Sequence, residues 1–290
     1  AVLAIALFIA GFGFKMGLVP FHMWLPDTYE GSPTTIGALL AAGTKKAGFA
    51  AAIRVIVLGM FALNLDWTLT LGVLAIFTMT LGNLAALIQR SLPRILAYSS
   101  IAQAGYILIG IAIAPYSDQA LSGSLFHIFN HAVMKSTGFI AAAAVATALA
   151  SYGLERYRGL GIRMPITAVA LAISMLALAG VPPLSGFWSK LVIFGAAINS
   201  SAYVWWGPYL AIAGVLNSAL SLGYYAWIIR KMYMEEGPDM SKLKEPKMII
   251  SVLLFGIVLM VAFGVWHAPL LEFATNSVPN LTNLVNFTNN

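Results

Sequence analysis

The sequence predicts an all-α fold: a polytopic bundle of transmembrane helices with about eight spans. Hydrophobic residues make up 60% of the 290 residues and charged residues only 9%, a balance that soluble globular chains do not show. Eight apolar segments reach the length of about 20 residues that a helix needs to cross a bilayer. All ten acidic residues lie between these segments or at their edges. The chain therefore belongs in a membrane.

The eight predicted spans follow one another along the chain, at about 1–25, 35–62, 67–89, 94–114, 120–149, 165–200, 203–231 and 248–271. The first, second, fifth and sixth carry cations, and the third, fourth, fifth and seventh carry neutral polar residues. These polar residues are Asn83 in the third span, Tyr98, Ser99, Ser100, Gln103 and Tyr106 in the fourth, Asn130 in the fifth, and Asn217, Ser218 and Ser221 in the seventh. Singly, such residues usually serve helix packing. Together they can form a hydrated track through the middle of the bundle.

Two of the spans are predicted to be broken. The first reads GFGFKMGLVPFHMWLP and the sixth LALAGVPPLSGFWSK, each with glycines and a Val-Pro pair inside an apolar run. Non-helical backbone at membrane depth is stable only where protein buries it or where it lines a wet cavity. Interrupted spans that run in opposite directions are typical of inverted repeats with an ion pathway at the midplane.

The repeat hypothesis divides the chain into three parts. Residues 1–62 are predicted to be the last two helices of a first, incomplete repeat, and residues 63–232 a complete five-helix repeat of inverted orientation. Residues 233–290 hold the last connection, the last span and a polar tail. Because the chain begins within a span, we expect it to be the C-terminal part of a longer protein.

The basic residues predict the orientation. The odd-numbered connections and their edges hold ten of the 16 lysines and arginines, and the even-numbered connections hold none. By the positive-inside rule the odd connections face the cytoplasm of a cell membrane, and both ends of this chain lie on the outer side. The net charge of +6 thus reflects membrane topology and gives no reason to expect nucleic-acid binding.

Six basic residues fall inside the spans. Arg54 lies near the end of its span and can snorkel to the interface, and Lys46 points about 100° away from Lys45. The others are Lys15, Lys45, Lys135 and Lys190. A lysine at mid-bilayer costs about 2.5–3.5 kcal/mol, so such residues face the protein interior or water and are functional candidates. A buried, unpaired ammonium tends to lose its proton, which makes these lysines candidate proton carriers.

The motif HIFNHAVMK places two histidines and a lysine on one face of the fifth span, because His127, His131 and Lys135 are four residues apart. A proton relay is the interpretation we favour, since histidine exchanges protons near neutral pH. The alternatives are a purely structural histidine pair and a zinc site at HxxxH, but the chain has no cysteine and no carboxylate within a span to complete a zinc site. No metal and no cofactor are expected on this chain.

Three blocks of sequence resemble the antiporter-like, proton-translocating membrane subunits of respiratory complex I. They are FKMGLVPFHMWLPDTYEGSPTTIGALLAAGTKKAGF, LPRILAYSSIAQAGY and LALAGVPPLSGFWSK. The YEGSPTT loop and the lysine of GFWSK are most similar to subunit N, including its counterpart in F420H2 dehydrogenase, whereas HIFNHAVMK is more similar to subunit L. The resemblance implies that Lys15, Lys45, His127, His131, Lys135 and Lys190 carry protons.

The resemblance also implies the chain's role. We expect a proton-translocating subunit of a complex I-like quinone or methanophenazine oxidoreductase, in which redox chemistry on other subunits drives proton movement and this chain holds no redox centre. The expected partners are other membrane subunits of the complex, including antiporter-like paralogues. Two alternatives stay open: a subunit of a multisubunit Na⁺/H⁺ antiporter or membrane-bound hydrogenase, and an intramembrane metalloenzyme using HxxxH.

Overall fold

The computed structural model describes residues 2–59 and 67–278, and within these ranges it is a bundle of helices without β-strands. Its helices, in chain order, are α1 (Val2–Met16), α2 (Trp24–Gly31), α3 (Thr34–Leu39), η1 (Leu40–Thr44), α4 (Lys45–Ala52), η2 (Ile53–Gly59), α5 (Thr68–Leu87), α6 (Leu92–Ile113), η4 (Ala114–Tyr116), α7 (Asp118–Leu149), η5 (Leu154–Tyr157), α8 (Leu160–Arg163), α9 (Pro165–Ala179), α10 (Ser185–Asn199), η6 (Ser200–Ala202), α11 (Gly207–Met234), α12 (Lys247–Val265) and α13 (Ala268–Asn276).

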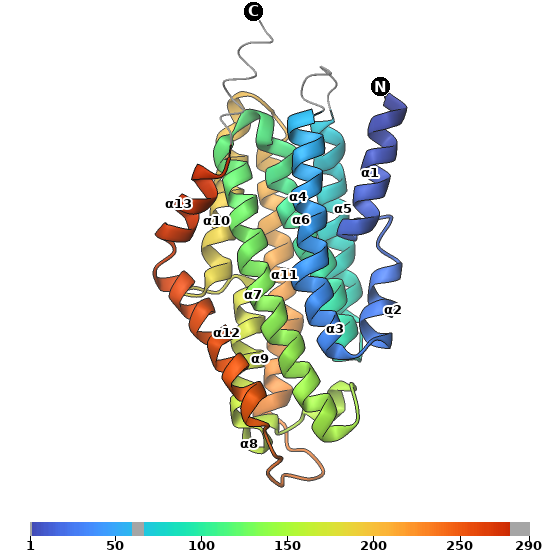
Figure 1. The fold of residues 1–290 in the computed structure, drawn as a ribbon, viewed down its shortest axis with the longest axis vertical. Helices are drawn as coiled ribbons and strands as arrows, with labels where there is room; N and C mark the ends of the chain where they lie inside the picture. The colour runs from blue at the N-terminus through green and yellow to red at the C-terminus, as the bar shows by residue number, and fades with distance from the viewer. Residues whose placement is uncertain (1, 60–66, 279–290) are drawn as a thin grey trace, which may run out of the picture.

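Six helical stretches in the described ranges are long and apolar enough to cross a membrane: 34–56, 68–87, 92–116, 118–149, 207–234 and 247–265. The other two predicted spans are the pairs α1–α2 and α9–α10. The all-α fold and the broken first and sixth spans predicted from the sequence are therefore confirmed. In Figure 1, α1 begins and α13 ends at the same end of the bundle, as an even number of crossings requires.

Local sequence explains both predicted breaks. α1 is followed by Gly17 at φ +68°, and α9 by Gly180 at φ +88°, the left-handed conformation that glycine adopts without steric cost. A proline follows each glycine within three residues and prevents the helix from resuming at once. The pair α1–α2 descends in Figure 1 while α9–α10 ascends, so the two broken elements run in opposite directions.

The last span has a further break that the sequence interpretation did not include. The expected segment at 248–271 is divided into α12 and α13, which are separated by Trp266 and His267. Pro269 lies in the first turn of α13, and its ring would clash with the carbonyl of Val265 if the helix continued. The predicted boundary between residues 62 and 63 and most of the predicted tail lie outside the described residues. The division into repeats stays a prediction.

The helix α6 lies at the centre of the bundle, and almost all of its residues are buried. It packs closely on α5 because two glycines face the neighbouring backbone. A Cβ on Gly82 would lie 2.6 Å from the Ala102 nitrogen, and one on Gly105 would lie 2.8 Å from the Met79 nitrogen. Small residues at such positions let transmembrane helices approach closely. The most polar predicted span is thus enclosed on all sides by protein.

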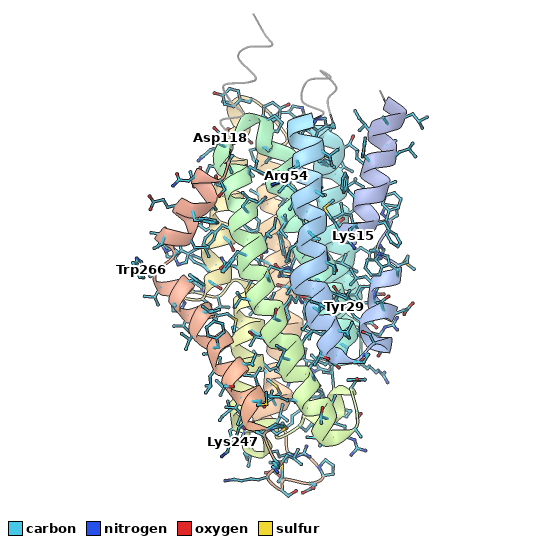
Figure 2. The ribbon with its side chains drawn as sticks, viewed as in Figure 1. Lys15, Tyr29, Arg54, Asp118, Lys247 and Trp266 are labelled. Carbon is cyan, nitrogen blue, oxygen red and sulfur yellow. The ribbon has the colours of Figure 1, made fainter. Side chains whose placement is uncertain are left out.

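The four odd-numbered connections meet at one end of the bundle, called here the basic end. Three contacts join them: Arg94 Nη1 to Glu30 Oε2 at 2.8 Å, Leu92 N donating to Tyr152 O at 3.1 Å, and Lys231 Nζ to Glu155 Oε1 at 2.8 Å. Figure 2 shows Lys247 at this end and Asp118 near the other. The grouping of basic connections inferred from the sequence is therefore present in space.

Candidate functional site

Five of the six predicted site residues are buried in the middle of the bundle. Lys45, His127, His131, Lys135 and Lys190 are each at most 4% exposed, and together they are called here the buried row. They come from α4, α7 and α10; α7 and α10 pack on α6, and α4 continues from η1, which packs on α7. None of the Asp or Glu side chains that the structure describes is buried. The row therefore gathers basic groups without an acidic partner in the described part of the chain.

Lys190 lies on α10 and occupies the break between α9 and α10. Its Nζ donates to the carbonyl oxygens of Leu178 at 2.8 Å and Ala179 at 3.1 Å. These carbonyls are available because α9 ends there, and the end of a helix carries partial negative charge. Gly180 provides the space for this side chain, because a Cβ at this position would lie 3.1 Å from Lys190 Cδ. The broken helix thus supplies a binding site for the ammonium of Lys190.

A neutral hydroxyl and an aromatic ring complete the surroundings of Lys190. Its Nζ donates to Ser218 Oγ on α11 at 3.0 Å and lies 4.5 Å from the centre of the Tyr106 ring on α6. The ring face attracts a cation. Because all these partners are uncharged or backbone groups, the lysine can change its protonation without leaving an unpaired acid behind.

His127 is connected to the Lys190 site through Gln103 on α6. The amide nitrogen of Gln103 donates to the Leu178 carbonyl at 2.9 Å, the same oxygen that accepts from Lys190. This fixes the amide so that its oxygen faces His127 Nε2 at 2.9 Å, and Nε2 is the donor. Nδ1 then faces Ser189 Oγ at 2.8 Å. Both ring nitrogens of His127 are therefore in hydrogen bonds.

Lys45 and Lys135 bind α6 from two sides, one helical turn apart. Lys45 Nζ donates to the Ser100 carbonyl at 2.6 Å. Lys135 Nζ donates to the Leu96 carbonyl at 2.9 Å and to Ser99 Oγ at 2.7 Å. Serines on α6 thus lie between lysines from two different helices.

His131 lies between these lysines and His127. Its ring is nearly parallel to the His127 ring, with centroids 6.1 Å apart. Its Nδ1 contacts Lys46 Nζ, and its Nε2 has no hydrogen-bond partner among the described residues. The motif HIFNHAVMK therefore forms the middle of the buried row, between Lys45 on α4 and Lys190 on α10.

A second polar network lies beside the row and joins α5, α6 and α11. Asn83 Nδ2 donates to Asn217 Oδ1 at 3.0 Å, and its amide oxygen accepts from Tyr224 at 3.1 Å. Asn83 also lies 3.3 Å from the hydroxyl of Tyr106, whose ring faces Lys190. The polar residues of the third, fourth and seventh predicted spans thus converge on one site.

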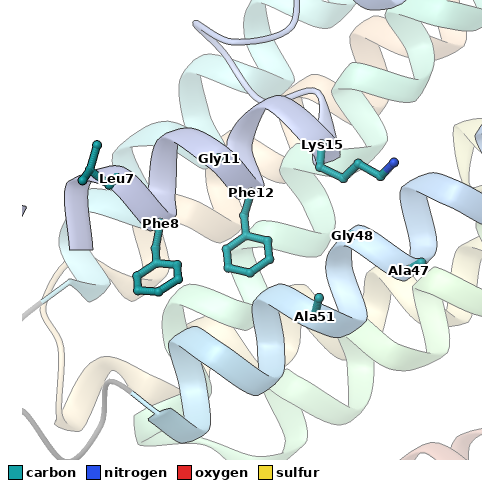
Figure 3. Close-up of a pocket in the computed structure, with 8 residues that line it drawn as sticks. All are labelled: Leu7, Phe8, Gly11, Phe12, Lys15, Ala47, Gly48 and Ala51. Atoms are coloured by element: carbon teal, nitrogen blue, oxygen red, sulfur yellow. The ribbon is translucent and has the colours of Figure 1, made fainter. Parts of the chain in front are cut away.

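Lys15 is the predicted site residue that the structure does not bring into the buried row. It is exposed and lies at one end of a pocket of about 370 Å³ between α1 and α4. Figure 3 shows Lys15 at this end and Phe8 and Phe12 along the pocket. Gly48 on α4 allows the close packing, because a Cβ there would lie 2.9 Å from Lys15 Cγ. Lys15 therefore lies against the helix that carries Lys45, outside the buried row.

The geometry of the histidine pair does not favour a shared metal. The two rings stack, and both nitrogens of His127 are in hydrogen bonds. The Nδ1 atom of His131 contacts the amine of Lys46. In the part of the chain that the structure describes, no three His, Cys, Asp or Glu side chains are grouped as a metal site requires.

Sequence reasoning missed the carbonyl ligands of Lys190, the contact of Lys46 with His131, and the role of Ser189 beside His127. Backbone acceptors have no side-chain signal, although the Gly-Val-Pro-Pro break marks where they occur. Ser189 adjoins Lys190 in the motif GFWSK. This position is the one sequence signal that Ser189 lies near the site.

Fold and site together define a multi-pass membrane protein whose helical bundle encloses a row of buried basic groups. The chain belongs to the family described as NADH:quinone oxidoreductase/Mrp antiporter, transmembrane, whose model matches residues 1–221.

Individual relatives agree with this family assignment. The chain is 44% identical over 283 residues to F(420)H(2) dehydrogenase subunit N of Methanosarcina mazei, covering 94% of this chain and 56% of the relative. It is 40% identical over 282 residues to NADH-quinone oxidoreductase subunit N 2 of Chloroherpeton thalassium, covering 94% and 54%. A chain of respiratory complex I from Thermus thermophilus superposes with a TM-score of 0.76 at 29% identity, covering 93% of this chain and 58% of that one. The chain thus spans about half the length of the curated relatives it matches.

Proposed function

We propose that this chain is part of a proton-translocating membrane subunit of a complex I-like oxidoreductase, acting on a quinone or methanophenazine. The observation that carries the proposal is the buried row, which links α4, α7 and α10 through contacts on α6. The names of the two relatives, one an F420H2 dehydrogenase subunit and the other an NADH-quinone oxidoreductase subunit, support it.

In this proposal the chain moves protons and leaves electron transfer to other subunits of the complex. A change in charge at one end of the row alters the protonation of the next basic group, because charges interact strongly in a low-dielectric interior. Lys45, His131, His127 and Lys190 then exchange protons in sequence across the bundle. Orientation follows from the positive-inside rule: the basic end faces the cytoplasm, and other membrane subunits flank the chain.

The test uses the full-length protein in its assembled complex. Lys45→Ala and Lys190→Ala should each abolish proton pumping while the complex still assembles, with pumping measured by quenching of a pH-sensitive dye in vesicles. Arg54→Ala is the matched control, because Arg54 is an exposed cation on the same helical stretch as Lys45. Near-normal pumping by both lysine variants would refute the proposal.

A second candidate function is cation/proton antiport within a multisubunit antiporter, and the family's description, which includes Mrp antiporters, favours it. The two functions differ in what drives transport. Purification with redox subunits, and pumping that needs an electron donor, would support the oxidoreductase. Sodium-driven proton movement without any donor would support the antiporter.

A further inference from the structure

Two adjacent lysines on α4 reach two different helices. Lys45 Nζ donates to the Ser100 carbonyl on α6 at 2.6 Å, whereas Lys46 Nζ contacts the imidazole Nδ1 of His131 on α7. Successive side chains on an α-helix point about 100° apart, so α4 can direct one lysine to α6 and the next to α7. Both lysines therefore face protein groups, although the sequence suggested a role only for Lys45.

The contact with His131 distinguishes Lys46 from Lys45. Lys45 makes no hydrogen bond to either histidine in the described part of the chain, and its acceptor is the backbone oxygen of Ser100. His131 is fully buried, and the other titratable side chains around it are Lys135, His127 and Lys45. Of these surrounding groups and Lys46, only Lys46 lies against a ring nitrogen of His131.

The unpartnered nitrogen of His131 gives this contact a direction. Lys46 lies at Nδ1, while Nε2 on the other edge of the ring is buried without a hydrogen-bond partner in the described residues. An imidazole can accept a proton at one nitrogen and release one from the other. The next ring along α7, that of His127, is stacked on His131.

We propose that Lys46 hands the proton from the lysine pair of α4 to the histidine pair of α7. In this step an Nζ–H bond of the Lys46 ammonium breaks and an Nδ1–H bond forms on His131, so the positive charge passes from the amine to the imidazole. The reverse transfer returns it, and no further reactant is needed. The inference rests on the proposed function and assigns one of its steps to a residue outside the predicted set.

The experiment compares Lys46→Arg, Lys46→Met and Lys45→Met in the full-length protein within its complex, and measures proton pumping against the rate of electron transfer. Arginine keeps a cation and hydrogen-bond donors at position 46 but does not give up its proton. Lys46→Arg therefore separates a proton carrier from a structural cation. Unchanged electron transfer shows that each variant has folded and assembled.

We expect Lys46→Arg and Lys46→Met to lower pumping by about tenfold or more, as expected when a positioned proton donor is removed. Combining Lys46→Met with His131→Gln should lower pumping no further than either change alone, because both remove the same step. Normal pumping by Lys46→Arg would overturn the inference, and so would additive losses in the double variant.

The Lys45→Met variant separates the two levels of the proposal. If it loses pumping while Lys46→Met pumps normally, the handover through Lys46 is refuted and the proposed function stands. If Lys45→Met and Lys190→Ala also pump normally, the proposed function itself fails, and the handover fails with it.

Discussion

Gln103 offers the sharpest test of the connection between the histidine pair and Lys190. It accepts from His127 Nε2 at 2.9 Å and donates to the Leu178 carbonyl at 2.9 Å, which also accepts from Lys190. In Gln103→Met the side-chain volume is nearly kept, but His127 Nε2–H loses its acceptor in a fully buried site. The Leu178 carbonyl keeps its bond from Lys190, so the cost falls mainly on His127.

The structure sets the size of the effect. Leaving a buried donor unpaired costs about 1–3 kcal/mol, which shifts an equilibrium between ring arrangements about 5- to 150-fold. We therefore expect Gln103→Met to lower proton pumping at least about fivefold at an unchanged rate of electron transfer. The assay is the ratio of protons moved to electrons transferred in vesicles that contain the full complex.

The matched control is Gln89→Met. Gln89 follows α5, and its Nε2 donates to the Ala85 carbonyl of that helix, near the basic end and away from the buried row. This variant should pump normally. Pumping by Gln103→Met at the level of the unmodified complex would refute the argument that Gln103 connects His127 to the Lys190 site.

Two further predictions concern stability. Gly264→Ala should lower the free energy of unfolding by about 3 kcal/mol, which is the upper part of the usual range for overpacking. The reason is that its Cβ would lie 1.9 Å from the Pro183 carbonyl oxygen. Thermal unfolding in detergent measures the effect. Gly195→Ala, where an added Cβ meets nothing within 4 Å, is the control, and equal melting temperatures would contradict the contact. At the basic end, the hydrogen bond from Lys231 lowers the pKa of the Glu155 carboxyl from its ordinary value of 4.5, so its stabilising effect is present above pH 4.5 and is lost as the pH falls through the lowered pKa. The melting temperatures of the unmodified protein and Glu155→Gln should therefore converge as the pH falls below 4.5, and parallel curves over that range would contradict the assignment.

Several parts of the site were predictable from sequence because they depend on local chemistry. Gly17 and Gly180, each followed by proline, dictate breaks that do not depend on the rest of the fold. The four-residue spacing of His127, His131 and Lys135 places them on one side of any α-helix, and therefore on one side of α7. Burial of Lys190 also follows, since a lysine at mid-membrane must face protein or water.

Other parts depend on which helices become neighbours. Nothing in the sequence around Gln103 indicates that its amide meets both His127 and the end of α9. Likewise, Lys45 and Lys46 are two adjacent lysines that the sequence does not distinguish by residue type. The structure distinguishes them because Lys45 contacts α6 and Lys46 contacts α7. Pro269 indicates the break in the last span. No local signal indicates that Gly264 contacts the break after α9.

The sequence by itself determined the membrane class, the helical spans, their breaks and the identity of the basic groups, because hydropathy, glycine and proline act over a few residues. Only the tertiary structure decided that five of these groups form a row, that Lys15 lies outside it, and that Lys46 meets His131. The physical reason is that a row across a bundle consists of contacts between helices distant in sequence. Those contacts are set by the close packing of α6 among its neighbours, which no single segment specifies.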